Sequence, residues 1–317
     1  MIQHLYLGRV AYDEALRLQA EIADLRYQNR VDNVLLLLEH PPVLTLGRNA
    51  NRTNVLASDE LLAQRGVTIH EINRGGDVTY HGPGQLIGYP IFDLRSLNNP
   101  NGGRLGPVDF VRMMEEALIR LCAIYGVRAG RIAGLTGVWC RASSRSLVEH
   151  PGEPIQNQSR PEAKIGAIGI HVARGITSHG FAFNVTTDLR DFQLINPCGI
   201  TDKPVTSLER EAPDPASLPT LEVIAYEAAR QFGHVFSEQM LAVEGLEALR
   251  AQASAPRAQS PAPEVPPKAQ LATPQVLPQV AAKPQSNPPE VVAEDTPLQI
   301  PPEVERLRHT PHRPERA

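Results

Sequence analysis

The fold class is decided by one stretch, residues 34–47, which reads Val34-Leu35-Leu36-Leu37-Leu38-Glu39-His40-Pro41-Pro42-Val43-Leu44-Thr45-Leu46-Gly47. Its first half is a short, continuous apolar run, which indicates a strand buried in the centre of a sheet. The two prolines close that strand, because a residue before proline is driven away from helical geometry. The second half, 43–47, predicts another strand directly afterwards.

Helical and strand patterns alternate on both sides of this stretch. Leu18, Ile22 and Leu25 recur at helical spacing and predict a helix over 12–29. Further helices are predicted at 108–125, with Cys122 on the apolar side, and at 219–239; further strands are predicted at 67–72, 85–92, 137–140, 165–172 and 180–187. Several strands follow one another through turns too short for the crossover helix that parallel pairing requires. We therefore predict a mixed-sheet α/β (α+β) domain.

Composition restricts the class of protein. The chain has 317 residues, of which 42% are hydrophobic and 21% charged, as in soluble globular proteins. A net charge of −4 does not favour a nucleic-acid partner, which calls for a basic surface. No apolar run approaches the roughly 20 residues that span a bilayer, and residues 1–9 lack the pattern of a signal peptide. We expect a cytoplasmic protein without a membrane partner.

The composition changes near Ser254. From there to Ala317 the sequence is rich in Pro, Ala, Gln, Val and Glu and has no sustained period. Such a segment cannot bury enough apolar surface to offset its loss of entropy on ordering. We predict one catalytic domain over 1–253, a disordered tail over 254–317, and an exposed, proline-interrupted loop at about 141–162.

The first segment with chemical character is glycine-rich and follows a predicted strand: Arg74-Gly75-Gly76-Asp77-Val78-Thr79-Tyr80-His81-Gly82-Pro83-Gly84-Gln85. Its glycines allow positive φ angles and close approach of a ligand to the backbone. The segment is neither a Walker A loop nor a dinucleotide fingerprint, since Gly-Lys-Ser/Thr and GxGxxG are both absent. Its hydrogen-bonding side chains, Arg74, Thr79, Tyr80 and His81, favour a binding loop over an ordinary glycine-rich turn.

Two further segments carry candidate reactive groups. Lys164 opens a strand in which Gly166, Ala167 and Gly169 leave room for a slender apolar ligand. Lysines at strand starts are usually solvated, so spacing alone does not select it. Cys198 lies between Pro197 and Gly199, in a turn where a side chain can be exposed.

The other two of the three cysteines are in less promising places. Cys122 falls on a helix face and Cys140 beside a tryptophan in a strand, and both positions are typical of packing residues. The three are too far apart for a CxxC pair or a metal cage. From position alone, a reactive thiol and an ordinary buried thiol remain equally good interpretations of Cys198.

Six ordered blocks together resemble the lipoyl(octanoyl) transferase family: residues 39–48, 74–89, 136–139, 164–172, 179–185 and 195–200. The resemblance covers about 5–238 and implies the catalytic-domain fold of the biotin and lipoate protein ligases. It implies Cys198 as the acyl-accepting nucleophile, Lys164 as the cation that lowers its pKa, and His81 as a further catalytic residue. The acyl-binding residues that it implies are Arg74, Gly75, Gly76, Asp77, Val78, Thr79, Tyr80, His81, Ala167, Ile168, Gly169, Gly180, Phe181 and Ala182.

The same resemblance implies the substrates. The donor is octanoyl-acyl carrier protein, with the acyl group on phosphopantetheine, and the acceptors are lysines of lipoyl domains in 2-oxoacid dehydrogenase E2 subunits and glycine cleavage H protein. No metal, nucleotide or other cofactor is expected, because the acyl group arrives activated as a thioester. Two alternatives remain open: an ATP-dependent lipoate or biotin protein ligase of the same fold, and a non-catalytic binding protein. The stretch between Trp139 and Lys164, and the tail, are longer than the family pattern requires.

Overall fold

The computed structural model describes residues 1–140, 162–196 and 203–255. The described residues belong to one compact unit, Met1–Gln259. The second unit, Ser260–Ala317, lies wholly outside them, as do Cys198 and, apart from Glu162, the predicted loop at 141–162. The predicted boundary between the domain and its tail stays a prediction.

Two β-sheets form the centre of this unit. The larger is eight-stranded and has the order β11 (Met240–Ala242), β1 (Ile2–Arg9), β2 (Asn33–Glu39), β6 (Gln85–Ile91), β10 (Ile176–Asn184), β9 (Ala163–Ala173), β8 (Leu135–Cys140), β7 (Ala129–Ile132). Its first three strands are parallel and the remaining neighbours are antiparallel. The smaller sheet has the order β4 (Thr68–Glu71), β3 (Val43–Leu46), β5 (Val78–His81), with β3 parallel to β4 and antiparallel to β5. The prediction of a mixed-sheet α/β fold is confirmed.

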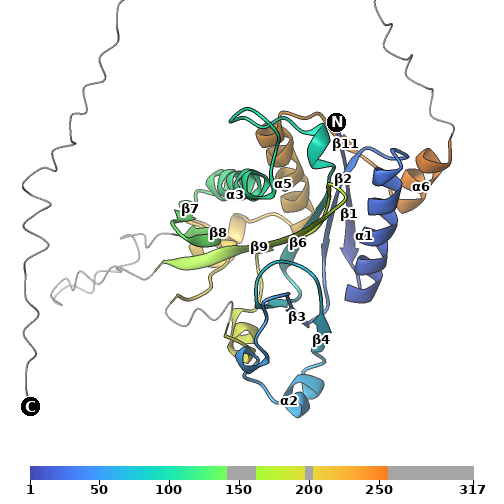
Figure 1. Cartoon of the computed structure of the whole chain (residues 1–317). Coiled ribbons are helices and arrows are strands. Elements are labelled where there is room, and N and C mark those ends of the chain that lie inside the picture. Colours follow the sequence, from blue (N-terminus) through green and yellow to red (C-terminus); the bar gives the residue numbers. More distant parts are fainter. Residues whose placement is uncertain (141–161, 197–202, 256–317) are drawn as a thin grey trace, which may run out of the picture. The chain divides into compact units, whose positions relative to one another are not determined.

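Helices cover both faces of the large sheet (Figure 1). On one face lie α1 (Tyr12–Tyr27) and α6 (Leu246–Ser254), and on the other α3 (Pro107–Ile124) and α5 (Leu221–Phe236). The short helices are α2 (Asp59–Gln64) and α4 (Leu208–Glu211), with 3-10 helices at η1 (Arg52–Asn54), η2 (Leu94–Ser96), η3 (Leu189–Leu194) and η5 (Pro215–Ser217). None of the helices in the described ranges is long and apolar enough to cross a membrane.

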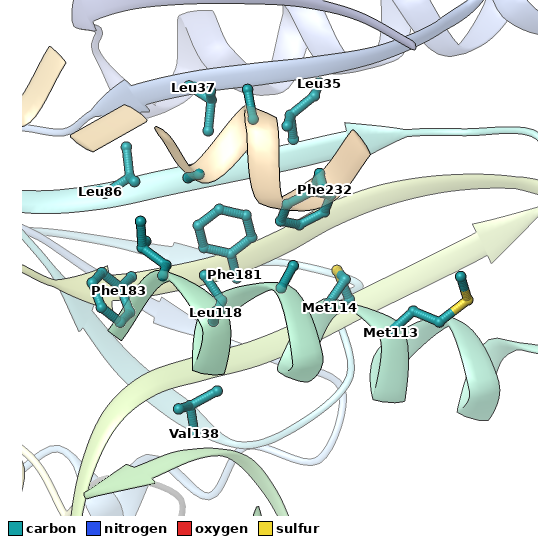
Figure 2. Packing of buried hydrophobic residues seen from close by; sticks show 14 of the residues in the cluster. Leu35, Leu37, Leu86, Met113, Met114, Leu118, Val138, Phe181, Phe183 and Phe232 are labelled. Carbon is teal, nitrogen blue, oxygen red and sulfur yellow. The ribbon is translucent and has the colours of Figure 1, made fainter. Parts of the chain in front are cut away.

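Strand β2 shows why its apolar run is continuous. Leu35 and Leu37 point into the core under α3 and α5, whereas Val34, Leu36 and Leu38 point into the core under α1 and α6. Successive side chains of a strand face opposite ways, so a strand covered on both faces has no solvent-facing positions. Figure 2 shows Leu35 and Leu37 above the phenylalanines of β10, in the layer that α3 and α5 close.

The segment His40-Pro41-Pro42 carries the chain from one sheet to the other. The strand before it, β2, lies third in the large sheet, and the strand after it, β3, lies in the middle of the small one. Leu44 and Leu46 of β3 pack in a separate core beneath the small sheet. The stretch that predicts two strands therefore links two sheets.

The structure corrects the sequence prediction at the glycine-rich segment. Residues 78–81 form strand β5, which pairs with β3 from Val43 opposite His81 to Leu46 opposite Val78. Glycines on both sides concealed this four-residue strand. The connection between β9 and β10 is also shorter than predicted, because Arg174 and Gly175 form a two-residue turn with φ of 53° and 84°. Strands β1, β7 and β11 and helices α2, α4 and α6 had not been predicted.

Gly180 in β10 tests how closely the sheet is packed. A Cβ atom at this position would lie 2.1 Å from the backbone oxygen of Gly88, which cannot move without breaking the β6–β10 ladder. We expect Gly180→Ala to lower the free energy of unfolding by about 3 kcal/mol. Gly130→Ala in β7 is the control, since its Cβ would meet nothing within 4 Å. Urea unfolding measures both, and equal stabilities would contradict the packing.

Candidate active site

A cavity of about 600 Å³ lies against the middle of β9 and β10. Residues of α1, of the glycine-rich segment, of the start of α3 and of the turn before β8 complete its wall. Its apolar, aromatic and small lining residues are Tyr12, Gly75, Gly76, Tyr89, Pro107, Val108, Val111, Gly134, Leu135, Ala167, Ile168, Gly169, Ile170, Gly180, Phe181 and Ala182. This volume is within the usual range for small-molecule sites.

The charged side chains of the lining are all cationic. Arg48, Arg74, Arg112 and Lys164 line the cavity, and no Asp or Glu does so among the described residues. Nor do three His, Cys, Asp or Glu side chains gather as a metal-binding group anywhere in the part of the chain that the structure describes. The cavity therefore favours a ligand group that is anionic or becomes so during a reaction.

Strand alternation divides the glycine-rich segment into two sets. Thr79 and His81 face the cavity, whereas Val78 and Tyr80 point into the core of the small sheet. Asp77 accepts hydrogen bonds from the Asn51 backbone N–H, at 3.0 Å, and from the Asn54 side chain. The structure thus brings Arg74, Gly75, Gly76, Thr79 and His81 to the cavity, and it places Asp77, Val78 and Tyr80 outside the lining.

Arg74 holds the glycine-rich segment to the small sheet. Its guanidinium Nη2 donates to the Thr45 carbonyl at 2.7 Å and to Thr45 Oγ1 at 2.9 Å, and Nη1 donates to the Gly75 carbonyl at 3.0 Å. The side chain is only 8% exposed. Much of its donor capacity is therefore used within the protein, and a ligand meets a guanidinium that is already fixed in orientation.

Glycines in β9 and in the glycine-rich segment allow the backbones of these two segments to approach each other closely. The Gly75 N–H donates to the Ile170 carbonyl at 3.0 Å, and a Cβ at Gly169 would lie 2.6 Å from the Gly75 oxygen. The space that Gly169 leaves is thus occupied in part by the loop itself, where the sequence suggested room for a ligand. Ala167, Ile168 and Gly169 nevertheless line the cavity.

His81 is held in one tautomer by its neighbours. Gln85 Nε2 donates to the Tyr80 carbonyl at 3.2 Å and to Asn184 Oδ1 at 2.9 Å, so Gln85 Oε1 faces His81 Nδ1 at 2.8 Å. Nδ1 must then carry the proton, and Nε2 keeps its lone pair, 3.4 Å from Thr45 Oγ1. Burial lowers the pKa of His81 to about 3. The imidazole is neutral near pH 7 and a weak base.

A cluster of rings behind the cavity escaped the sequence analysis. Tyr12 and Tyr89 line the cavity, and His40 lies between them, with its ring centroid 5.0 Å from that of Tyr12. His40 Nδ1 donates to the Val10 carbonyl at 2.7 Å, and the Tyr89 hydroxyl donates to His40 Nε2 at 2.8 Å. Burial lowers the pKa of His40 to about 4. The available signal was a histidine directly after one buried strand and a tyrosine within another, and local periodicity does not connect two such residues.

His179 also lines the cavity and was predicted as part of a turn. It lies within β10 with φ of 54°, a left-handed conformation that is unusual for histidine. Its N–H donates to Gln19 Oε1 of α1 at 2.7 Å, and its Nε2 contacts Asn73 Oδ1 at 2.7 Å. Burial, with a smaller contribution from the nearby Arg74 cation, lowers the pKa of His179 to about 4.

Lys164 stands in the cavity wall near the start of β9. Its ammonium lies 4.6 Å from the ring centroid of Trp139 on β8, within the range of a cation–π contact. Its backbone is bonded to the segment that follows Cys198 in sequence: the Lys164 N–H donates to the Pro204 carbonyl and the Thr206 N–H donates to the Lys164 carbonyl, both at 2.9 Å.

The cysteines that the structure describes are both buried. Burial raises the pKa of the Cys122 thiol well above its ordinary value and that of the Cys140 thiol to about 12. Neither is a thiolate near neutral pH, and neither lines the cavity. Their interpretation as packing residues is confirmed, and Cys198 is the third cysteine of the chain.

Three buried histidines at or behind the cavity lead to a prediction about stability and pH, and burial lowers the pKa of a fourth, His4, in the same direction. Their pKa values, about 4, 3 and 4 for His40, His81 and His179, lie below the 6.5 of an unfolded chain. The unfolded state therefore takes up protons first as the pH falls. The free energy of unfolding should be greatest above pH 6.5 and decrease from there to about pH 4, by up to about 1.4 kcal/mol per pH unit for each histidine.

His179→Asn should make this decrease shallower, since one of the contributing histidines is gone and asparagine tolerates positive φ. The exposed His234 offers a control, and His234→Asn should retain the wild-type slope. The slope is measured by urea unfolding between pH 7 and pH 4.5. An unchanged slope in His179→Asn would contradict the assigned protonation state.

Comparison with known proteins agrees with this geometry. The family described as lipoyl protein ligase A/B catalytic domain matches residues 11–228. An octanoyltransferase of Acidobacterium capsulatum is 59% identical over 241 residues, which cover 76% of this chain and 92% of that protein. An octanoyltransferase of Koribacter versatilis is 51% identical over 246 residues, which cover 78% of this chain and 88% of that protein.

Among solved structures, one of a bi-partite lipoate protein ligase system from Thermoplasma acidophilum is similar with a TM-score of 0.55, over 80% of this chain and 91% of that one. Its sequence identity is 16%, so this likeness bears on the fold alone. The resemblance inferred from the six sequence blocks is confirmed by the family match and by the two relatives. The chain belongs to the lipoyl protein ligase A/B catalytic-domain family and, within it, to the octanoyltransferases.

Proposed function

We propose that this protein transfers an octanoyl group from octanoyl-acyl carrier protein to the target lysine of a lipoyl domain. Its similarity to octanoyltransferases over most of their length supports this activity. The acceptors in this proposal are the lipoyl domains of 2-oxoacid dehydrogenase E2 subunits and the glycine cleavage H protein. The reaction takes place in the cytoplasm, where reducing conditions keep the Cys198 thiol free.

The observation that carries the mechanism is the position of Lys164 in the cavity wall. Its backbone bonds to Pro204 and Thr206 hold the segment that follows Cys198 against β9. A chain spans at most about 3.6 Å per residue, and residues 198–204 can therefore bring the thiol to the Lys164 ammonium. The burial of Cys122 and Cys140 supports Cys198 as the nucleophile.

The first half-reaction acylates the enzyme. A free thiol has a pKa near 8.5, and a neighbouring cation stabilises its thiolate. The Cys198 thiolate attacks the carbonyl carbon of the carrier thioester, the new C–S bond forms, and the bond to the phosphopantetheine sulfur breaks. The departing thiolate takes up a proton from the Lys164 ammonium, which leaves this lysine neutral for the second half-reaction. Lys164, in the cavity wall, supplies the cation.

The second half-reaction transfers the acyl group. The neutral amine of the target lysine attacks the acyl-Cys198 carbonyl, the amide bond forms, and Cys198 leaves as a thiolate. The amine nitrogen must lose a proton in this step, and Lys164 in its neutral form accepts it. A pKa of about 3 makes His81 a poor acceptor. We assign His81 a neutral role, in which its imidazole orders Thr45 and Gln85 at the cavity wall.

The scheme requires no nucleotide, metal or other cofactor, because the thioester supplies the driving force. An ATP-dependent ligase of the same fold would instead activate a free acid. The two are separated by incubating the full chain with octanoyl-acyl carrier protein and an apo lipoyl domain, without nucleotide and with EDTA. Octanoylated lipoyl domain is expected, and an absolute requirement for ATP would overturn the proposal.

Intact-mass analysis tests the nucleophile. After mixing with octanoyl-acyl carrier protein, the wild-type chain should gain one octanoyl group, located on Cys198 by peptide mapping. Cys198→Ala should gain none and lose both half-reactions. Cys140→Ala is the matched control and should still be acylated, since its thiol is buried and protonated. Full turnover by Cys198→Ala would exclude a covalent route through this residue.

Lys164→Arg separates the two roles given to this lysine. Arginine keeps the positive charge but cannot lose its proton near neutral pH. We expect acyl-Cys198 to form, with transfer to the lipoyl lysine slowed by about 10²-fold or more, the usual contribution of a general base. Lys164→Ala should impair both steps. Single-turnover kinetics of each half-reaction make the comparison, and an undiminished second step in Lys164→Arg would refute the base role.

A further inference from the structure

Glu115 is a fully buried carboxylate on the face of α3 that packs against the sheet. Its Oε2 accepts hydrogen bonds from Arg112 Nη1 at 2.7 Å and Arg131 Nε at 3.0 Å. Its Oε1 accepts a third, from the backbone N–H of Gly137, at 3.0 Å. A buried charge is costly unless it is paired and hydrogen-bonded, and these three donors satisfy both oxygens.

The partners of Glu115 lie on both strands of one hairpin. Arg131 belongs to β7 and Gly137 to β8, so the Glu115 carboxylate bonds to both strands of the hairpin from α3. The ladder between β7 and β8 is irregular between Gly130 and Ile132, whose partners on β8 are Trp139 and Leu135, and Gly137 lies within this irregular stretch. At this irregularity the Gly137 N–H turns toward the helix, and Glu115 provides its acceptor.

Gly137 in turn lies against Lys164. It has φ of 121°, and a Cβ at this position would be 2.6 Å from the Gly166 oxygen and 3.5 Å from Lys164 Cε. Two residues farther along β8, the Trp139 ring lies beneath the Lys164 ammonium. Strand β8 therefore contacts both the stem and the head of this lysine. A shift of β8 relative to β9 would move the ammonium within the cavity wall.

We propose that Glu115 is a positioning residue for Lys164, which it acts upon through the Gly137 N–H and strand β8. Its importance for the reaction rests on the function proposed above for Lys164. Glu115 itself does not line the cavity. An apolar residue would fill the same volume, but it would leave the Gly137 N–H without an acceptor.

Glu115→Gln is the informative variant because it preserves shape. The amide can offer its oxygen to Gly137 only by turning its NH₂ group toward two guanidinium donors, so it cannot satisfy both sides. The control is Glu116→Gln. Glu116 pairs with Arg120 and with Nη2 of Arg131, at 3.0 and 3.1 Å, and these partners lie on α3 and β7 rather than on β8. Glu115→Asp keeps the negative charge that pairs with the arginines, but its shorter side chain does not extend as far toward the Gly137 N–H. This variant replaces Glu115→Gln in the experiment if Glu115→Gln does not fold.

The position of Lys164 can be observed directly by NMR. The chain has four lysines and one tryptophan, so labelling lysine with ¹³C at Cε yields four signals. The signal of Lys164 should carry a ring-current shift, because its ammonium lies over the Trp139 ring. The spectrum of Lys164→Arg identifies the Lys164 signal, because this signal is missing from it. In Glu115→Gln and Glu115→Asp we expect this signal to move toward the shift of solvated lysine, and in Glu116→Gln to stay in place. An unmoved signal in both Glu115 variants overturns the proposal.

A double-mutant cycle tests the consequence for the thiol. The rate of Cys198 alkylation is measured against pH by peptide mass spectrometry. Glu115→Gln should raise the apparent pKa of the thiol by about one unit. Such a rise lowers the thiolate fraction about tenfold near neutral pH. In a Lys164→Ala background the same substitution should have no further effect. If Glu115→Gln raised the thiol pKa equally in the wild-type and Lys164→Ala backgrounds, Glu115 would act independently of Lys164. This result would overturn the positioning role.

The two proposals fail separately. A wild-type chain that gains no octanoyl group on Cys198 overturns the proposed mechanism, while the NMR signal still reports whether Glu115 positions Lys164. A wild-type chain that is acylated, with the Lys164 signal unmoved in the Glu115 variants, overturns the positioning role alone.

Discussion

The hydrogen bond from the Gly75 N–H to the Ile170 carbonyl joins the two sheets, and the cavity depends on it. It attaches the glycine-rich segment, which Arg74 fixes to the small sheet, to strand β9 of the large one. The approach is so close that Gly169 has no room for a side chain beside the Gly75 oxygen. The glycines therefore have a structural reason as well as the functional one that the sequence suggested: they let two backbones meet at the edge of a binding space.

The charges around this space follow one principle. Its titratable groups are either cationic or held neutral by burial, as His81 and His179 are. The one fully buried carboxylate in α3, Glu115, lies behind the wall, where it bonds to Gly137 rather than to a group in the cavity. An anion that forms next to Lys164 would thus meet no competing carboxylate among the described lining residues. This arrangement suits a reaction whose nucleophile and intermediates carry negative charge.

The hairpin β7–β8 connects the core to the chemistry. On its outer side it supplies Leu135 and Thr136 to the cavity wall, and on its inner side it is attached to α3 by Glu115. Interactions at a distance from the cavity can therefore affect the position of a group within it. We infer that the buried ion pairs of Glu115 serve to orient strand β8, since buried pairs are often weak contributors to stability.

The sequence by itself determined the elements that depend on neighbours along the chain. The periodicity of α1 and α3 and the apolar run of β2 are local, and the six ordered blocks sufficed to identify the family. It did not determine contacts between distant segments. Strand β5 exists because β3 lies beside it, and only that pairing decides that Thr79 and His81 face the cavity while Val78 and Tyr80 do not. Likewise, His40, His179 and Glu115 are unremarkable in sequence, and their roles follow from burial, which only the tertiary structure creates.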